Sequence, residues 1–307
     1  MNNIAFIYPG QGAQKVGMGR DFYENDETAK AIYDKASQWL GFDVPKLCFE
    51  ENEQLDMTEY TQAAMVTTSL AMTEVIKSQG IMPAVSAGLS LGEYAAIVAA
   101  GAMSAKDAIR LVRQRGILMQ NAGYAGTGSM AAVLGLGKEE MEAVIAEVEG
   151  VTIANYNAPG QIVITGFTWA IVAIEPLLKD AGAKRVVMLN VSGPFHSPLL
   201  EPVAKKLKDE LENVQLSKLN IPYVTNVTAK YVNDSEEIKG LLAKQVESSV
   251  LWEQSVEEMI SRGIDTFIEI GPGKTLTSFV KKINRDVKAY SVATLDDLKN
   301  VVGELGC

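Results

Sequence analysis

The sequence predicts an α/β fold in which a small domain is inserted into a larger one. Short apolar stretches at residues 4–8, 84–88 and 266–270 are each followed by a glycine-containing turn and a longer helical segment. This alternation is typical of a mainly parallel sheet with helices packed on it. Between residues 129 and 189 the order changes to strand, helix, strand, strand, helix, strand, which is the split βαβ or ferredoxin-like order.

The changed order indicates where the small domain begins and ends. We expect its strands at residues 130–136, 151–156, 161–165 and 185–189, and its helices at residues 138–148 and 168–181. The glycine-rich residues 123–128 and the segment 191–194 suit the two connections to the larger domain. The sequence therefore predicts a large domain formed by residues 1–124 and 191–307, and a small domain formed by residues 125–190.

Composition and charge exclude several classes of protein. The chain has 307 residues, of which 47% are hydrophobic, and a net charge of −10; this charge disfavours nucleic acid, which is bound by basic surfaces. No stretch reaches membrane-spanning length and no secretory signal is visible, so we expect a cytoplasmic protein without a membrane partner. Cys48 and Cys307 have no metal-ligand pattern nearby, which predicts two reduced thiols and no metal site.

Ser90 is the candidate nucleophile. It follows the second predicted strand, and the loops after parallel strands meet at the sheet edge where such folds place their sites. The run Gly-Leu-Ser-Leu-Gly around Ser90 fits G-x-S-x-G between a strand and a helix, the context of a nucleophile elbow. There the N–H of Leu91 would point at an oxyanion. The alternative is an ordinary strand-to-helix turn with a capping serine.

His196 is the candidate base because it is the one histidine in the chain. A nucleophilic serine needs a group that accepts its proton near neutral pH, and histidine is the usual one. His196 lies in a Gly-Pro-Phe-His-Ser-Pro turn that precedes a helix, so its ring could be held in place. A lone histidine is more often an ordinary surface or core residue, and the elbow serine reverses that preference.

Arg115 is a candidate for binding an anion. It shares the apolar stripe of a helix predicted at residues 105–121 and should point inward, whereas Arg110 and Arg113 should point outward. A buried guanidinium is costly without a negatively charged partner. That partner is either a carboxylate of the protein or the carboxylate of a substrate. When Arg115 is considered by itself, a salt bridge with a protein carboxylate is the preferred interpretation.

Two glycine-containing stretches fail the patterns of nucleotide-binding loops. Residues 10–15 have Lys15 where G-x-G-x-x-G needs its last glycine, and residues 268–275 have Ile268 where a P-loop begins with glycine. Neither stretch predicts a phosphate site. Gln11 nevertheless follows the first strand, so it offers a backbone N–H and a side-chain amide beside the elbow.

These motifs together resemble the malonyl-CoA:acyl carrier protein transacylases of fatty acid synthesis, which are related to the acyltransferase domains of polyketide synthases. The resemblance covers nearly the whole chain. The matching segments are residues 6–14, 88–94, 115–120, 155–163, 193–198 and 269–274. The resemblance implies an α/β-hydrolase-like large domain with an inserted ferredoxin-like small domain, in agreement with the fold predicted from the sequence pattern.

The resemblance also implies a role for each candidate residue. Ser90 would carry the acyl group and His196 would be the base. The N–H groups of Gln11 and Leu91 would form the oxyanion hole. Arg115 would bind the free carboxylate of malonate, so the substrate becomes the preferred partner for its charge.

Other implications come from the resemblance alone. Gln245 corresponds to a position whose carbonyl orients the histidine in place of a triad acid, and Phe195 resembles the pattern selective for malonyl over methylmalonyl. No metal or cofactor is implied; malonyl-CoA is the substrate and phosphopantetheine belongs to the partner, acyl carrier protein. Leu89 departs from the family, where histidine usually precedes the elbow serine, and we expect altered detail rather than lost activity.

Three other functions stay open. A serine thioesterase or hydrolase would use water as acceptor, but no acid between Ser90 and His196 stands out as a third triad member, and the inward Arg115 favours a carboxylated acyl group. A discrete acyltransferase could serve a polyketide synthase instead of fatty acid synthesis. A non-catalytic binding module of the same fold would be expected to have lost Ser90 or His196.

Overall fold

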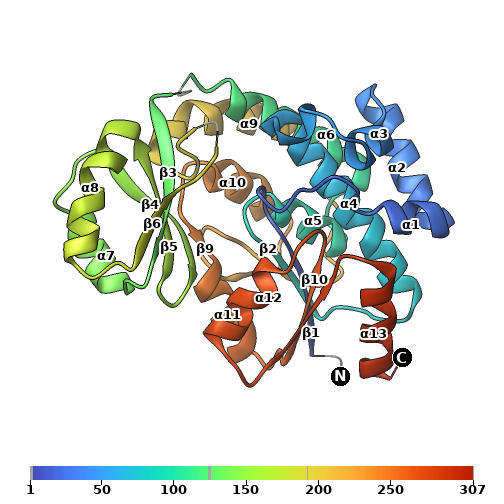
Figure 1. The fold of residues 1–307 in the computed structure, drawn as a ribbon. Coiled ribbons are helices and arrows are strands. Elements are labelled where there is room, and N and C mark those ends of the chain that lie inside the picture. The colour runs from blue at the N-terminus through green and yellow to red at the C-terminus, as the bar shows by residue number, and fades with distance from the viewer. Residues whose placement is uncertain (1–2, 124–125, 192, 307) are drawn as a thin grey trace.

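Two β-sheets form the framework of the protein, whose computed structural model describes residues 3–123, 126–191 and 193–306 (Figure 1). The six-stranded sheet is parallel except for the edge strand β8, which pairs antiparallel with β7. Its strands, in order across the sheet, are β11 (Lys288–Val292), β10 (Thr266–Ile270), β1 (Ile4–Tyr8), β2 (Val85–Gly88), β7 (Tyr223–Val224) and β8 (Tyr231–Val232). The three strands predicted from the sequence are therefore neighbours, and the loops after them share one edge.

Strand β1 is buried on both faces because its side chains alternate between two hydrophobic cores. Phe6 and Tyr8 belong to the larger core, whereas Ala5 and Ile7 belong to the smaller one. The helices that contribute to the larger core are α1 (Arg20–Asn25), α2 (Glu27–Leu40), α3 (Val44–Phe49), α4 (Thr58–Ser78), α5 (Gly92–Ala99), α6 (Ala105–Gln120), α9 (Glu201–Glu212), α10 (Glu236–Gln245) and α13 (Leu295–Leu305). The smaller core takes side chains from α11 (Trp252–Ser261) and α12 (Thr275–Ile283).

The five-stranded sheet consists of the predicted insertion and one added strand. In order, its strands are β6 (Arg185–Met188), β3 (Gly128–Leu134), β5 (Gln161–Phe167), β4 (Val151–Ala158) and β9 (Val250–Leu251). The first four pair antiparallel and follow the predicted order along the chain with α7 (Lys138–Ile145) and α8 (Thr168–Asp180). Both helices pack on this sheet around a core of its own (Figure 1). Strand β9 comes from the C-terminal part of the chain and pairs parallel with β4.

The predicted ends of these elements agree with the structure to within three residues. The largest difference is at α7, which ends at Ile145 and not at residue 148. The N–H groups of Glu147 and Val148 donate to carbonyls three residues earlier. The last turn is therefore tighter than an α-helix, although its apolar pattern continues the helical period.

Some of the predicted features lie outside the described residues, namely Tyr124 and Ala125 at one domain boundary, Ser192 at the other connection, and Cys307. Cys48 is a free thiol buried in the larger core, and burial raises its pKa to about 12. Within the described part of the chain, no helix has both the length and the apolar character needed to cross a membrane.

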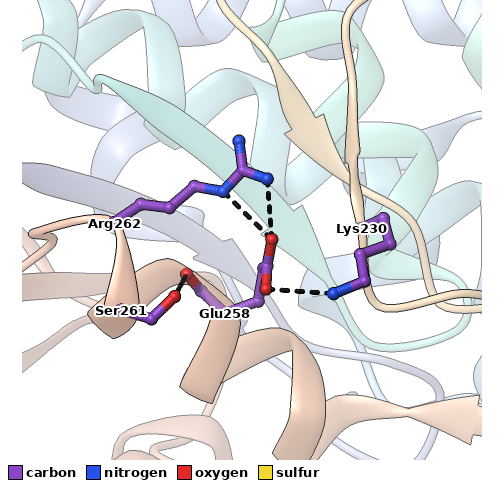
Figure 2. A network of polar contacts seen from close by, with 4 residues as sticks. All are labelled: Lys230, Glu258, Ser261 and Arg262. Carbon is purple, nitrogen blue, oxygen red and sulfur yellow. Dashed lines mark hydrogen bonds and ion pairs between the residues drawn. The ribbon is translucent and has the colours of Figure 1, made fainter.

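A network of ion pairs fastens α11 to the turn between β7 and β8 (Figure 2). Glu258 accepts hydrogen bonds from Lys230 at 3.2 Å and from two nitrogens of Arg262 at 3.0 and 2.8 Å. The guanidinium of Arg262 also lies 4.1 Å from the ring centroid of Tyr231. Because the side chains of Lys230 and Arg262 are half exposed or more, each pair contributes about 1 kcal/mol or less. The network mainly orients α11.

The packing of α5 against β1 depends on Gly92. A Cβ atom there would lie 2.1 Å from the carbonyl oxygen of Tyr8. We expect Gly92→Ala to lower the free energy of unfolding by about 1–3 kcal/mol, because the helix must move away from the sheet. Urea denaturation measures this change.

The matched control is Gly240→Ala in α10, where nothing lies within 4 Å of the added Cβ atom. This substitution is expected to raise the free energy of unfolding by about 0.5–1 kcal/mol, because alanine favours a helix more than glycine does. Equal stability of Gly92→Ala and the wild type would contradict the close contact between α5 and β1.

Candidate active site

Ser90 lies in a sharp turn between β2 and α5. Its φ angle is 51°, in the left-handed region where residues other than glycine are strained. Asn226 holds the turn, because its Oδ1 accepts from the N–H of Ser90 at 2.7 Å and its Nδ2 donates to the carbonyl of Gly88 at 2.7 Å. A Cβ atom at Gly88 would lie 1.9 Å from the carbonyl carbon of Gly92. The turn therefore needs its first glycine and has the geometry expected of an elbow.

The tertiary structure brings His196 to Ser90. The Nε2 atom of His196 lies 2.7 Å from the Oγ atom of Ser90. On the other side of the ring, Nδ1 lies 2.9 Å from the carbonyl oxygen of Gln245 and 3.2 Å from that of Ser248. Carbonyl oxygens only accept hydrogen bonds, so Nδ1 carries the proton in the neutral ring. Nε2 is then free to accept the proton of Ser90.

The environment of His196 keeps its ring neutral. The side chain is 4% exposed, and burial is the main cause that lowers its pKa to about 4, with the positive charge of Arg115 acting in the same direction. The hydrogen bonds to Gln245 and Ser248 oppose this shift. At neutral pH the imidazole is therefore unprotonated and able to act as a base.

Arg115 points inward from α6, as its place in the helical pattern predicts, and is 1% exposed. Its Nη1 donates to Oε1 of Gln62 at 2.9 Å, and its Nη2 donates to Oε1 of Gln245 at 3.1 Å. Nη2 also lies 3.3 Å from the Oγ atom of Ser90. The guanidinium faces the ring of Tyr94, 5.5 Å from its centroid. A positive charge is therefore held next to the candidate nucleophile.

The partners of Arg115 leave its charge uncancelled. No carboxylate of the described residues lies within ion-pair distance of it. The expected ion pair with a protein carboxylate is thus not found in the described part of the chain. Burial lowers the pKa of Arg115, and the charge of Glu93 opposes this shift without forming an ion pair with it. Arg110 is exposed as predicted. Arg113 is partly buried and not fully outward, because it pairs with Glu59 at 2.6 Å and lies 4.1 Å from the ring centroid of Tyr60.

The site includes four residues that the sequence did not single out: Gln62, Glu93, Asn226 and Ser248. Glu93 is fully buried, and burial raises its pKa to about 7 against the hydrogen bond from Gln245. Glu93 could have been found from the sequence, because it is a glutamate at the start of an otherwise apolar helix. The other three lie in segments without any motif, and only packing shows their part in the site.

A cavity of about 370 Å³ opens beside Ser90, His196 and Arg115. It is lined by Gln11, Leu89 and Phe195 from the loops around the six-stranded sheet, and by residues of the five-stranded sheet: Met130, Asn155, Asn157 and Val163. Both sheets therefore contribute a wall. Leu89 makes the wall beside the nucleophile apolar.

The two amides proposed for an oxyanion follow β1 and β2, which are neighbours in the sheet. None of the described residues accepts a hydrogen bond from the N–H of Gln11 or of Leu91. The side chain of Gln11 is held by Gln62, whose Nε2 donates to it at 3.4 Å. Gln62 thus links the Gln11 loop to Arg115.

Comparison with known proteins identifies the family. Residues 5–300 match the model of the acyl transferase domain. The chain belongs to the acyl transferase family. A malonyl CoA-acyl carrier protein transacylase from Bacillus subtilis is 44% identical to it over 310 residues, which cover 99% of this chain and 98% of that protein.

Solved structures agree with this assignment. A malonyl CoA-acyl carrier protein transacylase from Clostridium perfringens has a TM-score of 0.96 and 42% identity to this acyl transferase, covering 99% of this chain and 97% of that one. A malonyl-transacylase in complex with a type II polyketide synthase acyl-carrier protein has a TM-score of 0.95 and 37% identity, covering 98% and 99%. The mixed α/β fold of this acyl transferase is thus that of solved malonyl transacylases.

The burial of His196 and the nearby charge of Arg115 predict an unusual pH dependence for this acyl transferase. His196 can accept a proton only when neutral, so the reaction of Ser90 with an uncharged sulfonyl fluoride should be lost as the pH falls through about 4, and not through 6.5. Replacing the neighbouring cation by Arg115→Gln should move this acid limb to higher pH, because a nearby positive charge disfavours the imidazolium ion. The rate of inactivation against pH measures both.

Arg110→Gln is the matched control, since Arg110 is exposed on the same helix. Its acid limb should coincide with that of the wild type. An acid limb near 6.5 in the wild type would contradict the lowering of the His196 pKa by burial. No upward shift in Arg115→Gln would contradict the electrostatic link between Arg115 and His196.

Proposed function

We propose that this acyl transferase moves a malonyl group from coenzyme A to the phosphopantetheine thiol of acyl carrier protein, through an ester on Ser90. The observation that carries the proposal is the buried, uncancelled charge of Arg115, with Nη2 3.3 Å from the Oγ atom of Ser90. A carboxylate on the acyl group would supply the missing anion at the correct place. The names of the relatives agree with this substrate.

The first half-reaction follows from the Ser90–His196 contact. Nε2 of His196 takes the proton from Ser90, whose oxygen attacks the thioester carbonyl. The N–H groups of Gln11 and Leu91 receive the negative charge that develops on the carbonyl oxygen. When the tetrahedral intermediate collapses, the bond to sulfur breaks, coenzyme A leaves with the proton from His196, and malonyl-Ser90 remains.

The second half-reaction repeats these steps with a different nucleophile. The phosphopantetheine thiol of the carrier protein gives its proton to His196 and attacks the malonyl ester. The bond to Ser90 breaks, and Ser90 recovers its proton from His196. Arg115 holds the malonyl carboxylate throughout, and the apolar side chain of Phe195 limits the space beside the acyl chain. No metal or redox cofactor has a part in these steps.

The architecture suits transfer between two carriers. We assign residues 1–124 and 191–307 to an α/β-hydrolase-like large domain and residues 125–190 to an inserted ferredoxin-like small domain. The strand order β6-β3-β5-β4 supports the second assignment. The cavity lies between the two parts, so the pantetheine arm of either carrier would enter there. Fatty acid synthesis is the preferred pathway; a polyketide carrier protein, as bound by one relative, offers the same thiol.

Mass spectrometry after mixing the protein with malonyl-CoA alone tests the proposal. We expect a malonyl adduct on the Ser90 peptide, none in Ser90→Ala, and adduct formation slowed about 100-fold in Arg115→Ala, because the charged hydrogen bonds to the carboxylate are lost. Arg110→Ala, which changes an exposed arginine of the same helix, should behave like the wild type.

Other outcomes would change the assignment. Free malonate without an adduct would favour a serine thioesterase or hydrolase, in which water is the acceptor. An adduct that forms equally fast in Arg115→Ala would mean that the acyl group is not selected by its carboxylate. Absence of both adduct and free malonate would refute the proposal that malonyl-CoA is the acyl donor.

A further inference from the structure

Glu93 is a buried carboxylate that the reaction steps leave unused. It is in the first turn of α5, three residues after Ser90, and is completely buried. Its Oε2 atom accepts hydrogen bonds from Nε2 of Gln245 at 2.7 Å and from the backbone N–H of Asn226 at 3.2 Å. Its carboxylate makes no hydrogen bond with the hydroxyl of Ser90 or the ring of His196, so it does not act on the reacting atoms directly.

The contacts of the Gln245 carboxamide determine which way it points. Its Nε2 faces Oε2 of Glu93 and the carbonyl oxygen of Ser90, at 2.7 and 2.9 Å. The Ser90 carbonyl can only accept, and Oε2 of Glu93 already accepts from the N–H of Asn226, so the NH₂ group must lie on this side. The oxygen then faces Nη2 of Arg115 at 3.1 Å, which can only donate. Reversal would place NH₂ against a guanidinium and oxygen against a carboxylate.

We propose, on the basis of the malonyl transfer proposed above, that Glu93 is a positioning residue for the acyl carboxylate, because it fixes the Gln245 carboxamide that receives Arg115. Gln245 thereby joins two functions in one residue. Its side chain holds the guanidinium, and its backbone carbonyl holds Nδ1 of His196 at 2.9 Å. Only the first function depends on Glu93.

An amide between Glu93 and Arg115 has an electrostatic consequence. A carboxylate in direct contact with the guanidinium would form an ion pair and compete with the carboxylate of the substrate. The Gln245 carboxamide transmits the orientation through two hydrogen bonds and keeps the opposite charges apart. Arg115 is thus held in place while its charge stays available to the acyl group.

A double-mutant cycle with Glu93→Leu and Gln245→Leu tests this role. Gln245→Leu keeps the backbone carbonyl that holds His196. Two rates are measured for each protein: malonylation of Ser90 by malonyl-CoA, and inactivation by an uncharged sulfonyl fluoride, which needs only Ser90 and His196. Glu269→Gln, compared with Glu93→Gln, is the control for loss of a buried carboxylate, because Glu269 is also fully buried but accepts hydrogen bonds from Leu276 and Thr277.

We expect each leucine variant to lose about 10- to 100-fold in the malonylation rate, as for a lost hydrogen bond to a charged group. The sulfonyl fluoride rate of Glu93→Leu should change by less than about threefold. The double variant should lose no more of the malonylation rate than the single ones, because both act on one interaction. If Glu93→Leu does not fold, Glu93→Gln serves instead, because its amide can place a donor against Gln245. The ratio of the malonylation rate to the sulfonyl fluoride rate should then also fall. In Glu269→Gln this ratio should stay as in the wild type.

Parallel loss of both rates would overturn the proposal, since it would indicate a general structural role. Losses that multiply in the double variant would overturn it as well, because Glu93 would then act independently of Gln245. A wild type that takes no malonyl group from malonyl-CoA would refute the proposed function and this role together, and is recognised before any variant is compared.

Discussion

The buried charge of Arg115 is the constraint on which the rest of the site depends. Removing a guanidinium from water costs several kcal/mol unless its donors are satisfied. Here Nη1 and Nη2 donate to neutral oxygens of Gln62, Gln245 and Ser90, whereas the buried Nε has no partner among the described residues. These oxygens accept hydrogen bonds without cancelling the charge. The site therefore keeps an attraction for an anion within hydrogen-bond distance of the nucleophile, which is the property that separates a carboxylate-selective acyl transferase from a general serine hydrolase.

The same charge and the same burial determine the state of His196. A low pKa keeps the imidazole neutral, and the carbonyls of Gln245 and Ser248 select the tautomer whose Nε2 faces Ser90. A triad carboxylate would orient the ring equally well, but it would bring a negative charge into direct contact with His196, beside the cation of Arg115. Backbone carbonyls orient the ring without that competition. The absence of an obvious triad acid between Ser90 and His196 is consistent with this arrangement.

Much of the fold was predictable because its signals are local. Strands β1, β2 and β10 are mainly apolar, are buried throughout and lead into glycine-containing turns, and the insertion shows its elements in sequence order. Strands β7, β8, β9 and β11 were not predicted. The first three have two residues each, too short for any alternation of side chains to be visible. Strand β11 has five residues, but only two of them are buried. The pairing of β9 with β4, which joins the C-terminal part of the chain to the insertion, depends on packing between segments about a hundred residues apart.

The sequence by itself determined the elements whose physics is local: the strained turn at Ser90 from its flanking glycines, the inward direction of Arg115 from the helical period, and His196 as the one histidine available. Only the tertiary structure decided how these residues are held. Gln62 from α4, Glu93 from α5, Asn226 and Gln245 meet around them through hydrogen bonds that join residues as far as 155 positions apart. Such bonds need distances and directions that exist only after helices from different parts of the chain have packed, so no local pattern records them.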